Sequence, residues 1–433
     1  MTVYDTELVR AVPQQYIGFS IDPANLCHVV RLAQTTPAFV QLFRNLGPGT
    51  FRIGGNTGDK NASWSSTAAS PTCRWNGLVI TPGLVRSFFA FAEQVGYRVM
   101  WQVPLNNGES RQDAAEAAYV STMPDLYSIE IGNEPNYYYD ASTDYQAYID
   151  DWATIYRDYI ADDGEAPVTG PAATVSATFY INPFLDQHAT DVIADTGHWY
   201  AGTALSKPTC STLLHSTSRA STAAGVAIAS NHGLPFIMNE TNTYTGYGMS
   251  GVSNAYCSAL WAADYTLNGL AVGASGMYFH GTADYPPGNS HGQVQYYTPI
   301  TQDGTPAPEY YGMLFYYEVA QAGGSQVAAS IAHVTGVDAY AVAGSDGKLR
   351  VALVNHGSTT TPIVITTARS YSRATEISLT APALDSLSGV RLGKASVASD
   401  GTWTPAPKAI VVSGKRSTVT VPAYVSTVVT YSR

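Results

Sequence analysis

The strongest constraint on the fold is a repeated order of strand-like and helix-like segments between residues 15 and 322. Short apolar runs that suit buried strands alternate with longer segments of helical periodicity. In Pro82–Val95, for example, Leu84, Phe88 and Phe91 fall on one helical face. This order predicts a (β/α)₈ barrel, the α/β fold in which eight parallel strands each lead into a helix. The predicted strands are Tyr16–Ile21, Thr50–Ile53, Arg98–Val103, Tyr127–Ile131, Pro167–Pro171, Val192–Tyr200, Pro235–Met238 and Gly276–His280.

The pattern changes after Gly324 to short segments rich in β-branched residues. Val337–Ala343 and Leu349–Asn355 flank Ser345-Asp-Gly347, which is a hairpin signal. We therefore expect a C-terminal antiparallel β-sandwich domain. Val3–Val12 is also strand-like, and it has no partner inside a closed barrel. The predicted division is a catalytic barrel over residues 14–324 and a β-sandwich domain made of residues 1–13 plus 325–433.

Composition narrows the classes of partner. The chain has 433 residues and a formal net charge of −11, and only 13% of its residues are charged. An acidic surface opposes binding to a nucleic-acid backbone, so we expect no nucleic-acid partner. No apolar run is long enough to cross a membrane. The 30 tyrosines suit a carbohydrate-binding cleft as well as ordinary packing. We expect a monomer that acts on a carbohydrate or glycoside and needs no cofactor.

Few charges with much Ser, Thr, Tyr and Gly are typical of secreted proteins. The first residues, Met1-Thr-Val-Tyr-Asp5, lack the basic and apolar regions of a signal peptide. We expect either a secreted protein whose leader is absent from this sequence or a cytoplasmic protein, and the composition favours secretion. The four cysteines can pair in three ways or remain free thiols, and we expect at least one disulfide. These cysteines are Cys27, Cys73, Cys210 and Cys257.

Two glutamates follow predicted barrel strands directly. Glu134 comes after Asn133 at the end of the fourth strand, and Glu240 comes after Asn239 at the end of the seventh. Catalytic groups of such barrels lie at the carboxyl ends of the strands, so the two carboxylates should face each other across the mouth. Taken alone, Glu134 fits an ordinary polar loop equally well. A second carboxylate in the same setting favours a glycosidase, whose chemistry needs two such groups.

The two glutamates receive different roles. One carboxyl group must protonate the leaving oxygen while the other attacks the anomeric carbon. Glu240 ends the more apolar strand, which contains Leu234-Pro-Phe-Ile-Met238. We assign Glu134 as acid/base and Glu240 as nucleophile.

Polar residues at other strand ends are candidates for substrate binding. We expect Asp22 and Asn56 to contact sugar hydroxyls, although turn capping is the alternative, and Asn25 fits both roles equally. The Asn133 amide suits a sugar 2-hydroxyl. Tyr200 can hydrogen-bond the nucleophile or simply pack at the barrel rim. We expect His198 and His280 to be hydrogen-bonding core residues rather than bases, and no metal is expected, because no His/Asp/Glu cluster has ligand spacing.

Several motifs resemble one family of enzymes. The Asn-Glu pair on the fourth strand with a second Glu on the seventh resembles the clan of retaining glycoside hydrolases built on this barrel. Narrower motifs are similar to glycoside hydrolase family 79, the β-glucuronidase and heparanase family. They are Phe19-Ser-Ile-Asp-Pro-Ala-Asn-Leu26, Phe51-Arg-Ile-Gly-Gly-Asn-Thr-Gly-Asp59, His198-Trp-Tyr200, Asn239-Glu-Thr-Asn242, Gly251-Val-Ser-Asn-Ala-Tyr256, Ala259-Leu-Trp-Ala-Ala-Asp-Tyr265 and Tyr278-Phe-His280. The resemblance runs across the barrel, and the sandwich fits the architecture of the family.

The loop after Glu240 departs from that family. Its members typically carry a run of glycines here, whose backbone N–H groups take the carboxylate of a uronic acid. This chain has Tyr244-Thr-Gly-Tyr-Gly248. Gly246 and Gly248 can still offer backbone N–H groups to a carboxylate, with help from the hydroxyls of Tyr244 and Tyr247. Alternatively, Tyr247 can fill that space and favour a neutral sugar. Tyr296 and Tyr297, in a loop after the eighth strand, are further candidates for the cleft wall, and a solvated loop is an equal alternative.

These observations leave three hypotheses. The leading one is a retaining exo-β-glucuronidase that works by double displacement. The second keeps the chemistry and changes the sugar, giving a β-glucosidase or a disaccharide-specific β-glycosidase. The third is a carbohydrate-binding protein without catalysis, which retention of both glutamates opposes.

Overall fold

A computed structural model describes residues 1–75, 77–105, 107–140, 142–162, 164–216, 218–283, 294–332 and 334–433. Eight parallel strands close into a barrel in the order β10-β11-β12-β2-β3-β7-β8-β9. This confirms the predicted fold class, including the strands expected near residues 167 and 192. The barrel strands are β2 (Ile17–Ile21), β3 (Thr50–Ile53), β7 (Arg98–Val103), β8 (Leu126–Ile131), β9 (Val168–Thr174), β10 (Val192–Tyr200), β11 (Phe236–Asn242) and β12 (Gly276–His280).

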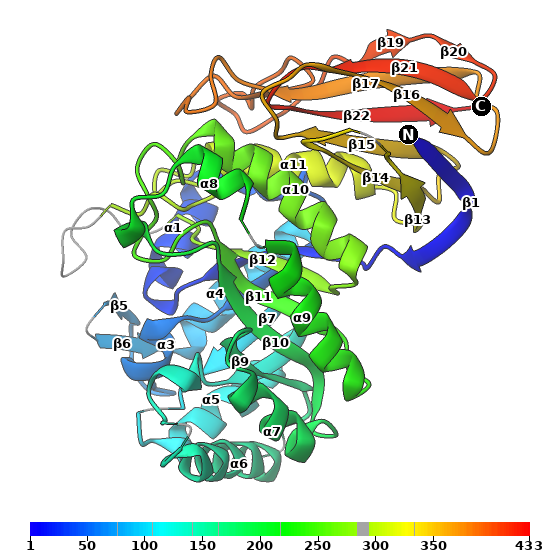
Figure 1. Cartoon of the computed structure of the whole chain (residues 1–433). Helices are drawn as coiled ribbons and strands as arrows, with labels where there is room; N and C mark the ends of the chain where they lie inside the picture. The colour runs from blue at the N-terminus through cyan, green and yellow to red at the C-terminus, as the bar shows by residue number, and fades with distance from the viewer. Residues whose placement is uncertain are drawn as a thin grey trace.

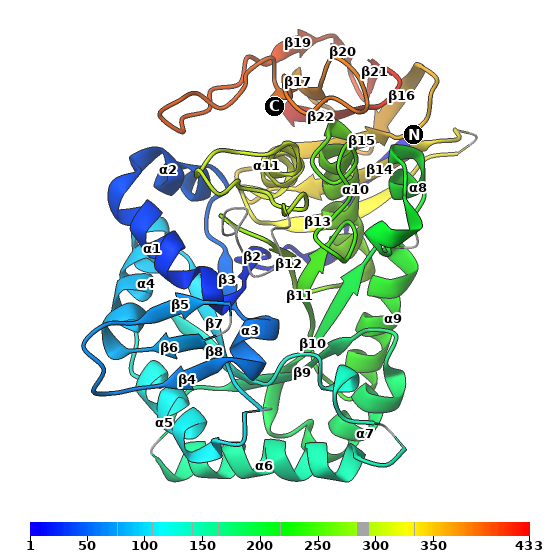
Figure 2. The same cartoon turned by 90° about the vertical axis from the view of Figure 1, so that its left-hand side faces the viewer.

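Helices surround the barrel in the order that the sequence predicts (Figures 1 and 2). Helix α7, which has Pro183 in its interior, is one that the sequence patterns did not single out. The described helices are α1 (Leu26–Thr35), α2 (Pro37–Asn45), α3 (Asn56–Lys60), α4 (Pro82–Val95), α5 (Ser110–Ser121), α6 (Tyr145–Ala161), α7 (Thr178–His188), α8 (Cys210–Leu214), α9 (Ser218–Asn231), α10 (Tyr256–Val272) and α11 (Pro308–Ala320). None of the helices in the described ranges combines the length and apolar character that crossing a bilayer requires.

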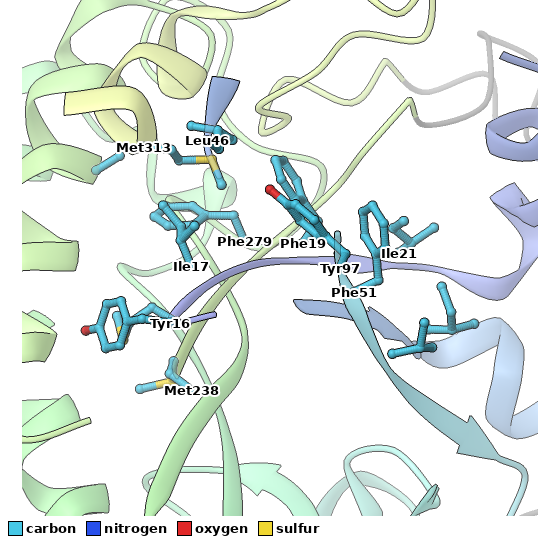
Figure 3. Packing of buried hydrophobic residues seen from close by; sticks show 14 of the residues in the cluster. Tyr16, Ile17, Phe19, Ile21, Leu46, Phe51, Tyr97, Met238, Phe279 and Met313 are labelled. Atoms are coloured by element: carbon cyan, nitrogen blue, oxygen red, sulfur yellow. The ribbon is translucent and has the colours of Figure 1, made fainter. Parts of the chain in front are cut away.

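The barrel strands are buried on both faces, which explains their nearly continuous apolar sequences. Every residue of β2 is buried, and Phe19 packs against aromatic rings from neighbouring segments (Figure 3). The Phe51 and Tyr97 ring centroids are 4.6 Å apart, and Phe19 meets Phe43 edge-on at 4.9 Å. This packing fixes the strand ends, and with them the side chains at the barrel mouth.

The remaining large sheet forms a two-layer domain. Its strands follow the order β18-β17-β22-β15-β14-β13-β1-β16-β21-β20, with β19 beside β17. All pairings are antiparallel except that of β1 (Thr2–Ala11) with β16. The segment near the N-terminus thus pairs with this sheet, as expected. The other strands are β13 (Ser325–Ser330), β14 (Val337–Ala343), β15 (Leu349–Asn355), β16 (Thr361–Thr367), β17 (Arg373–Thr380), β18 (Arg391–Leu392), β19 (Lys408–Ile410), β20 (Val412–Ser413), β21 (Arg416–Val421) and β22 (Val425–Ser432).

The sheet domain packs on the barrel through α10 and α11 (Figure 1). Strand β15 is buried along its whole length, because one face meets the barrel helices and the other meets the second layer. Polar contacts cross the same junction. The Tyr256 hydroxyl donates to the carbonyl oxygens of Leu379 and Tyr424, and Tyr340 donates to Asp264 at 2.7 Å. The barrel and the sheet domain therefore share one continuous core.

A small third sheet lies beside the barrel mouth, between β3 and α4. It consists of β4 (Ala62–Trp64), β6 (Gly77–Ile80) and β5 (Thr72–Arg74), in that spatial order. The disulfide Cys27–Cys73 joins this sheet to α1. A second disulfide, Cys210–Cys257, joins α8 to α10. All four cysteines are therefore paired, and one of the three possible pairings is selected.

Candidate active site

A cavity of about 1120 Å³ opens at the carboxyl ends of the barrel strands. Glu134 and Glu240 both line it, together with residues from most of the surrounding loops. The cavity therefore lies where barrels of this type place their chemistry.

Glu134 is held in an unusual backbone conformation just beyond β8. Gly132 has φ +85° and Glu134 has φ +49°, a left-handed conformation that side-chain-bearing residues adopt rarely. The Glu134 backbone N–H donates to the carbonyl of Ala172 at 2.9 Å. Because Pro135 then begins a short 3₁₀ turn, the strand cannot continue. The carboxylate is thereby turned toward the cavity, where its Oε1 lies 3.1 Å from Nδ1 of His198.

Glu240 is aimed into the cavity by an irregularity in β11. In the pairing with β10, Gly197 faces Met238 and His198 faces Glu240, so Asn239 is an extra residue. Such a bulge breaks the alternation of side chains along a strand. Asn239 and Glu240 consequently both point inward. Asn239 donates to Glu130 inside the barrel, and Glu240 stands above it at the mouth.

The two carboxylates meet across the cavity. One ligand atom from each of Glu134, Glu240 and His198 lies within 4.8 Å of the others. Retaining glycosidases hold their carboxyl groups about 5–5.5 Å apart, whereas inverting ones leave about 6.5–9.5 Å for a water molecule. The observed separation corresponds to the retaining arrangement.

Arg52 on β3 lies beneath the pair, fully buried. Its Nε donates to Glu130 at 2.8 Å, and its Nη1 donates to Glu240 at 2.7 Å. Further bonds reach Ser20 at 3.2 Å and Asn133 Oδ1 at 2.8 Å. The fork of a guanidinium group suits this role, because it offers several donors in a fixed plane. Burial alone would lower the pKa of Arg52, but the charges of Glu130 and Glu240 raise it.

The surroundings of Glu240 stabilise its ionised form. Burial by itself would raise the pKa of Glu240, but His280, His198 and Arg52 together hold it well below the ordinary value. The Tyr200 hydroxyl adds a hydrogen bond of 2.8 Å to Oε1. Nδ1 of His280 and of His198 lie 3.7 and 3.9 Å from Oε2. Glu240 is thus suited to act as an anion at neutral pH.

Glu134, His198 and Glu240 form a possible set of metal ligands. Sequence spacing did not reveal this set, because the residues come from the loop after β8, from β10 and from β11. Glu134, Glu240 and His198 offer two carboxylates and an imidazole within 4.8 Å. However, the Arg52 guanidinium already occupies Oε2 of Glu240 at 2.7 Å. A fixed positive charge at that distance opposes a second cation.

Several predicted binding residues line the cavity with the carboxylates. They are Asp22, Asn25, Asn56, Tyr200, Gly246 and Tyr247. Asp22 also caps a turn, because its carboxylate accepts from Ala24 N at 3.0 Å and from the Thr57 hydroxyl. Burial raises the pKa of Asp22. Gly246 and Tyr247 have φ +75° and +70°, so this loop follows a left-handed path along the wall.

Three predicted contacts are corrected by the structure. Oδ1 of Asn133 accepts from Arg52, and Asn133 is not among the residues that line the cavity. Tyr244 is buried in the core and packs near Gly202 rather than facing the cavity. Tyr296 borders a neighbouring cavity of about 510 Å³, and its neighbour Tyr297 lines the main one. In each case the residue lies in the expected segment, but it does not line the main cavity.

Sequence reasoning missed two kinds of residue. Arg52 lies within the motif Phe51–Asp59, but no function was predicted for it. Its only sequence signal is a charged residue within an apolar strand pattern. His198 and His280 are buried and hydrogen-bonded, as expected. Their place in the cavity lining, within 4 Å of Glu240, was not predicted. His280 Nδ1 additionally lies 2.9 Å from the Ser20 hydroxyl.

The closed parallel barrel with its flanking two-layer sheet domain is the fold of several solved glycoside hydrolases. No family model matches the sequence, and no curated protein matches it significantly.

Among solved structures, this chain is similar to a 4-O-α-L-rhamnosyl-β-D-glucuronidase from Fusarium oxysporum 12S in complex with Rha-GlcA. The TM-score is 0.73 at 21% identity, covering 99% of this chain and 100% of the other. An α-L-arabinofuranosidase from Thermotoga maritima gives 0.69 at 14% identity, covering 99% and 98%. A family 30 endoxylanase from Clostridium papyrosolvens C71 gives 0.62 at 13% identity, covering 100% and 99%. These likenesses establish the fold.

Proposed function

We propose that this protein is a retaining exo-β-glycosidase that hydrolyses β-D-glucuronides. The observation that carries the proposal is the placement of Glu134, Glu240 and His198 within 4.8 Å of one another in one cavity. The proposal includes membership of glycoside hydrolase family 79 and secretion. The two disulfides support secretion, because such bonds persist mainly in oxidising compartments.

In the first step, a Glu240 oxygen attacks the anomeric carbon. The glycosidic bond breaks, and its electron pair stays on the leaving oxygen, which takes a proton from Glu134. The product is a glycosyl ester on Glu240 and a free alcohol. Arg52 and Tyr200 keep Glu240 ionised before attack and hold it in position.

In the second step, Glu134 removes a proton from water. The resulting oxygen attacks the anomeric carbon, and the Glu240 ester bond breaks. The sugar leaves with its original configuration, and both glutamates return to their starting states. Two displacements on the same carbon explain why the chemistry retains configuration.

A carboxylate-bearing sugar is favoured by the loop after β11. Residues 245–247 line the cavity, and Gly246 and Gly248 have φ +75° and +79°. Backbone N–H groups in such left-handed turns commonly bind anions. The enzyme whose solved structure gives a TM-score of 0.73 is a 4-O-α-L-rhamnosyl-β-D-glucuronidase, and this likeness also supports the choice of a glucuronide.

A second candidate is a glycosidase for a neutral sugar or for a disaccharide. The observation in its favour is that Tyr247 lines the cavity at the position where the loop turns. Its ring can occupy the space of a uronate carboxylate. Substituting Tyr247→Gly suits the positive φ and removes the ring. Under the neutral-sugar alternative this variant should gain glucuronide hydrolysis relative to glucoside hydrolysis, and under the leading proposal it should not.

The decisive experiment compares three para-nitrophenyl substrates: the β-D-glucuronide, the β-D-glucoside and the glucuronide that carries α-L-rhamnose on its 4-hydroxyl. We expect the two glucuronides to be hydrolysed and the β-D-glucose product to be minor. A fluorinated glucuronide that accumulates as a covalent intermediate should label Glu240, as identified by peptide mass spectrometry. Labelling of another residue, or release of the α-anomer first, would refute the mechanism.

A further inference from the structure

Trp75 forms a wall of the cavity that hydrolysis of a single sugar does not require. It follows β5, in the turn toward β6 of the small sheet, and its half-buried indole lines the cavity. Trp64 of the same sheet shows the ordinary alternative, because it lies in the core and packs near Tyr119 at 5.2 Å. In the part of the chain that the structure describes, Trp75 belongs to neither large core cluster. A large apolar ring at an accessible cavity wall is therefore available for a ligand.

Trp75 and the strand before it are tied to neighbouring segments. The disulfide Cys27–Cys73 fixes the strand two residues earlier to α1. The Asn61 side chain donates to the Trp75 carbonyl at 2.9 Å, and Leu78 N donates to the Asn61 carbonyl at 2.9 Å. An indole positioned in advance loses little conformational freedom when a ligand binds.

Glu134, after β8, and Glu240, on β11, lie on opposite parts of the barrel rim. The strands between them fall into two groups, one on each side of the pair. On one side lie β12, β2 and β3 with the small sheet, and on the other lie β9, β10 and α9 (Figure 2). The first side contributes the more strongly hydrogen-bonding residues, namely Asp22, Asn25, Asn56, Lys60, Asn61 and His280. The second contributes His198 and Tyr200, whose polar atoms are within hydrogen-bond distance of Glu134 and Glu240, and otherwise mainly small or weakly polar residues such as Val175, Ser176, Ala220, Ser221 and Ala224.

This difference indicates how a glycoside lies in the cavity. The sugar that is attacked must be recognised through its hydroxyls, so it belongs toward the polar side. The leaving group needs less specific contact, so it belongs toward the smaller residues. Asp22 and Asn56 follow the barrel strands β2 and β3, whereas Trp75 follows β5 of the small third sheet, and all three line the cavity. A ring stacked on Trp75 is then attached to the attacked sugar rather than to its leaving group.

We propose that Trp75, with Asn61 and Lys60 beside it, forms a subsite for a second sugar on the non-reducing side of the hydrolysed residue. The preferred substrate is accordingly a β-linked disaccharide unit, released whole. The apolar face of a pyranose packs on the indole, while Asn61 and Lys60 meet its hydroxyls or a charged substituent. This inference rests on the proposed glycosidase function.

The test compares the para-nitrophenyl glucuronide with its rhamnosylated form in the wild type, Trp75→Ala and Trp75→Phe. We expect Trp75→Ala to lower kcat/KM for the rhamnosylated substrate about tenfold, the loss of a stacking interaction worth about 1.5 kcal/mol. Activity on the unsubstituted glucuronide should be unchanged, and Trp75→Phe should retain most of the preference. Equal effects on both substrates, or no effect on either, would overturn the subsite. If the wild type cleaves only neutral glycosides, the β-glucoside and β-cellobioside form the test pair.

Tyr137 provides a matched control, because it is an aromatic residue of the same cavity just after Glu134 and is 69% exposed. Tyr137→Ala should change both substrates by the same factor and leave their ratio intact. Calorimetric titration with free Rha-GlcA gives a readout independent of turnover. Glu240→Gln should bind this disaccharide about tenfold more tightly than Glu240→Gln/Trp75→Ala. Failure of Glu240→Gln to bind it, or equal binding by both, contradicts the subsite, whereas absence of hydrolysis by the wild type refutes the proposed function itself.

Discussion

Nη1 of Arg52 lies 2.7 Å from Oε2 of Glu240, and both side chains are buried at the base of the cavity. The two residues are 188 positions apart in the sequence. The same guanidinium donates to Glu130 and Asn133, so the bottom of the site is one connected charge network. A buried cation at this place orients Glu240 and, together with His280 and His198, lowers the pKa of its carboxyl group.

Replacing Arg52 tests this network. Arg52→Lys keeps a positive charge but loses the fork that reaches four partners, leaving a buried glutamate without its bond. We expect unfolding free energy to fall by about 3–5 kcal/mol, with a large loss of kcat. Urea denaturation and steady-state kinetics measure the two effects. Arg350→Lys is the matched control, because Arg350 is also buried and makes a two-pronged bond to Asp346 in the sheet domain. It should leave kcat unchanged, and a similar kcat loss there would argue against a specific role of Arg52.

The hydrogen bond from Tyr200 to Glu240 should be visible in the pH profile. Tyr200→Phe removes one of the contacts that lower the pKa of Glu240, so this pKa should rise. Since a bond to a charged group contributes about 1.5–3 kcal/mol, we expect kcat to fall about 10- to 100-fold. The acid limb of kcat/KM should move to higher pH by about one unit. A loss of activity without movement of this limb would mean that Tyr200 only shapes the cavity.

Glu134→Gln tests the two proposed catalytic roles. The amide cannot donate a proton to a departing alkoxide, but an activated aryl leaving group needs little protonation. Loss of general acid catalysis costs about 10²–10⁴-fold, so alkyl glycosides should lose activity by this order and dinitrophenyl glycosides much less. The measurement is kcat/KM across a series of leaving groups. Equal losses over the whole series would remove Glu134 from the role of acid, and Glu109→Gln, an exposed glutamate, serves as the control.

Buried carboxyl groups away from the site predict how stability depends on pH. Burial raises the pKa of Glu116 to about 8, although a hydrogen bond from Trp101 opposes this. The group is protonated in the folded state and ionises on unfolding above its ordinary value of 4.5. Its contribution to stability is therefore present below about pH 4.5 and is lost as pH rises to about 8, by about 1.4 kcal/mol per pH unit.

Glu116→Gln keeps the oxygen that accepts from Trp101 and removes the titration. We expect its unfolding free energy to decline less than that of the wild type between about pH 5 and pH 8, measured in buffers of the same ionic strength. Chemical denaturation at several pH values measures this difference. Parallel curves for variant and wild type would show that Glu116 is ionised in both states.

Much of the fold could be predicted from local patterns. The apolar runs and helical faces indicated the barrel, because strands buried on both faces and helices with one apolar stripe leave distinct periodicities. Glu134 and Glu240 could be placed at the mouth, because each follows a strand directly and parallel strands of a barrel end at one rim. The unpaired strand near the N-terminus likewise had to find its partners outside the barrel.

Where side chains point was decided by the tertiary structure. The bulge at Asn239 turns Glu240 inward, and the left-handed backbone at Glu134 turns its carboxylate toward His198. Tyr244 and Tyr296 look like cavity residues in the sequence, yet their side chains lie elsewhere. Sequence order specifies which strand carries a residue, but distances between strands far apart in the chain arise only when the barrel closes. The contact of Arg52 with Glu240 is a product of that closure.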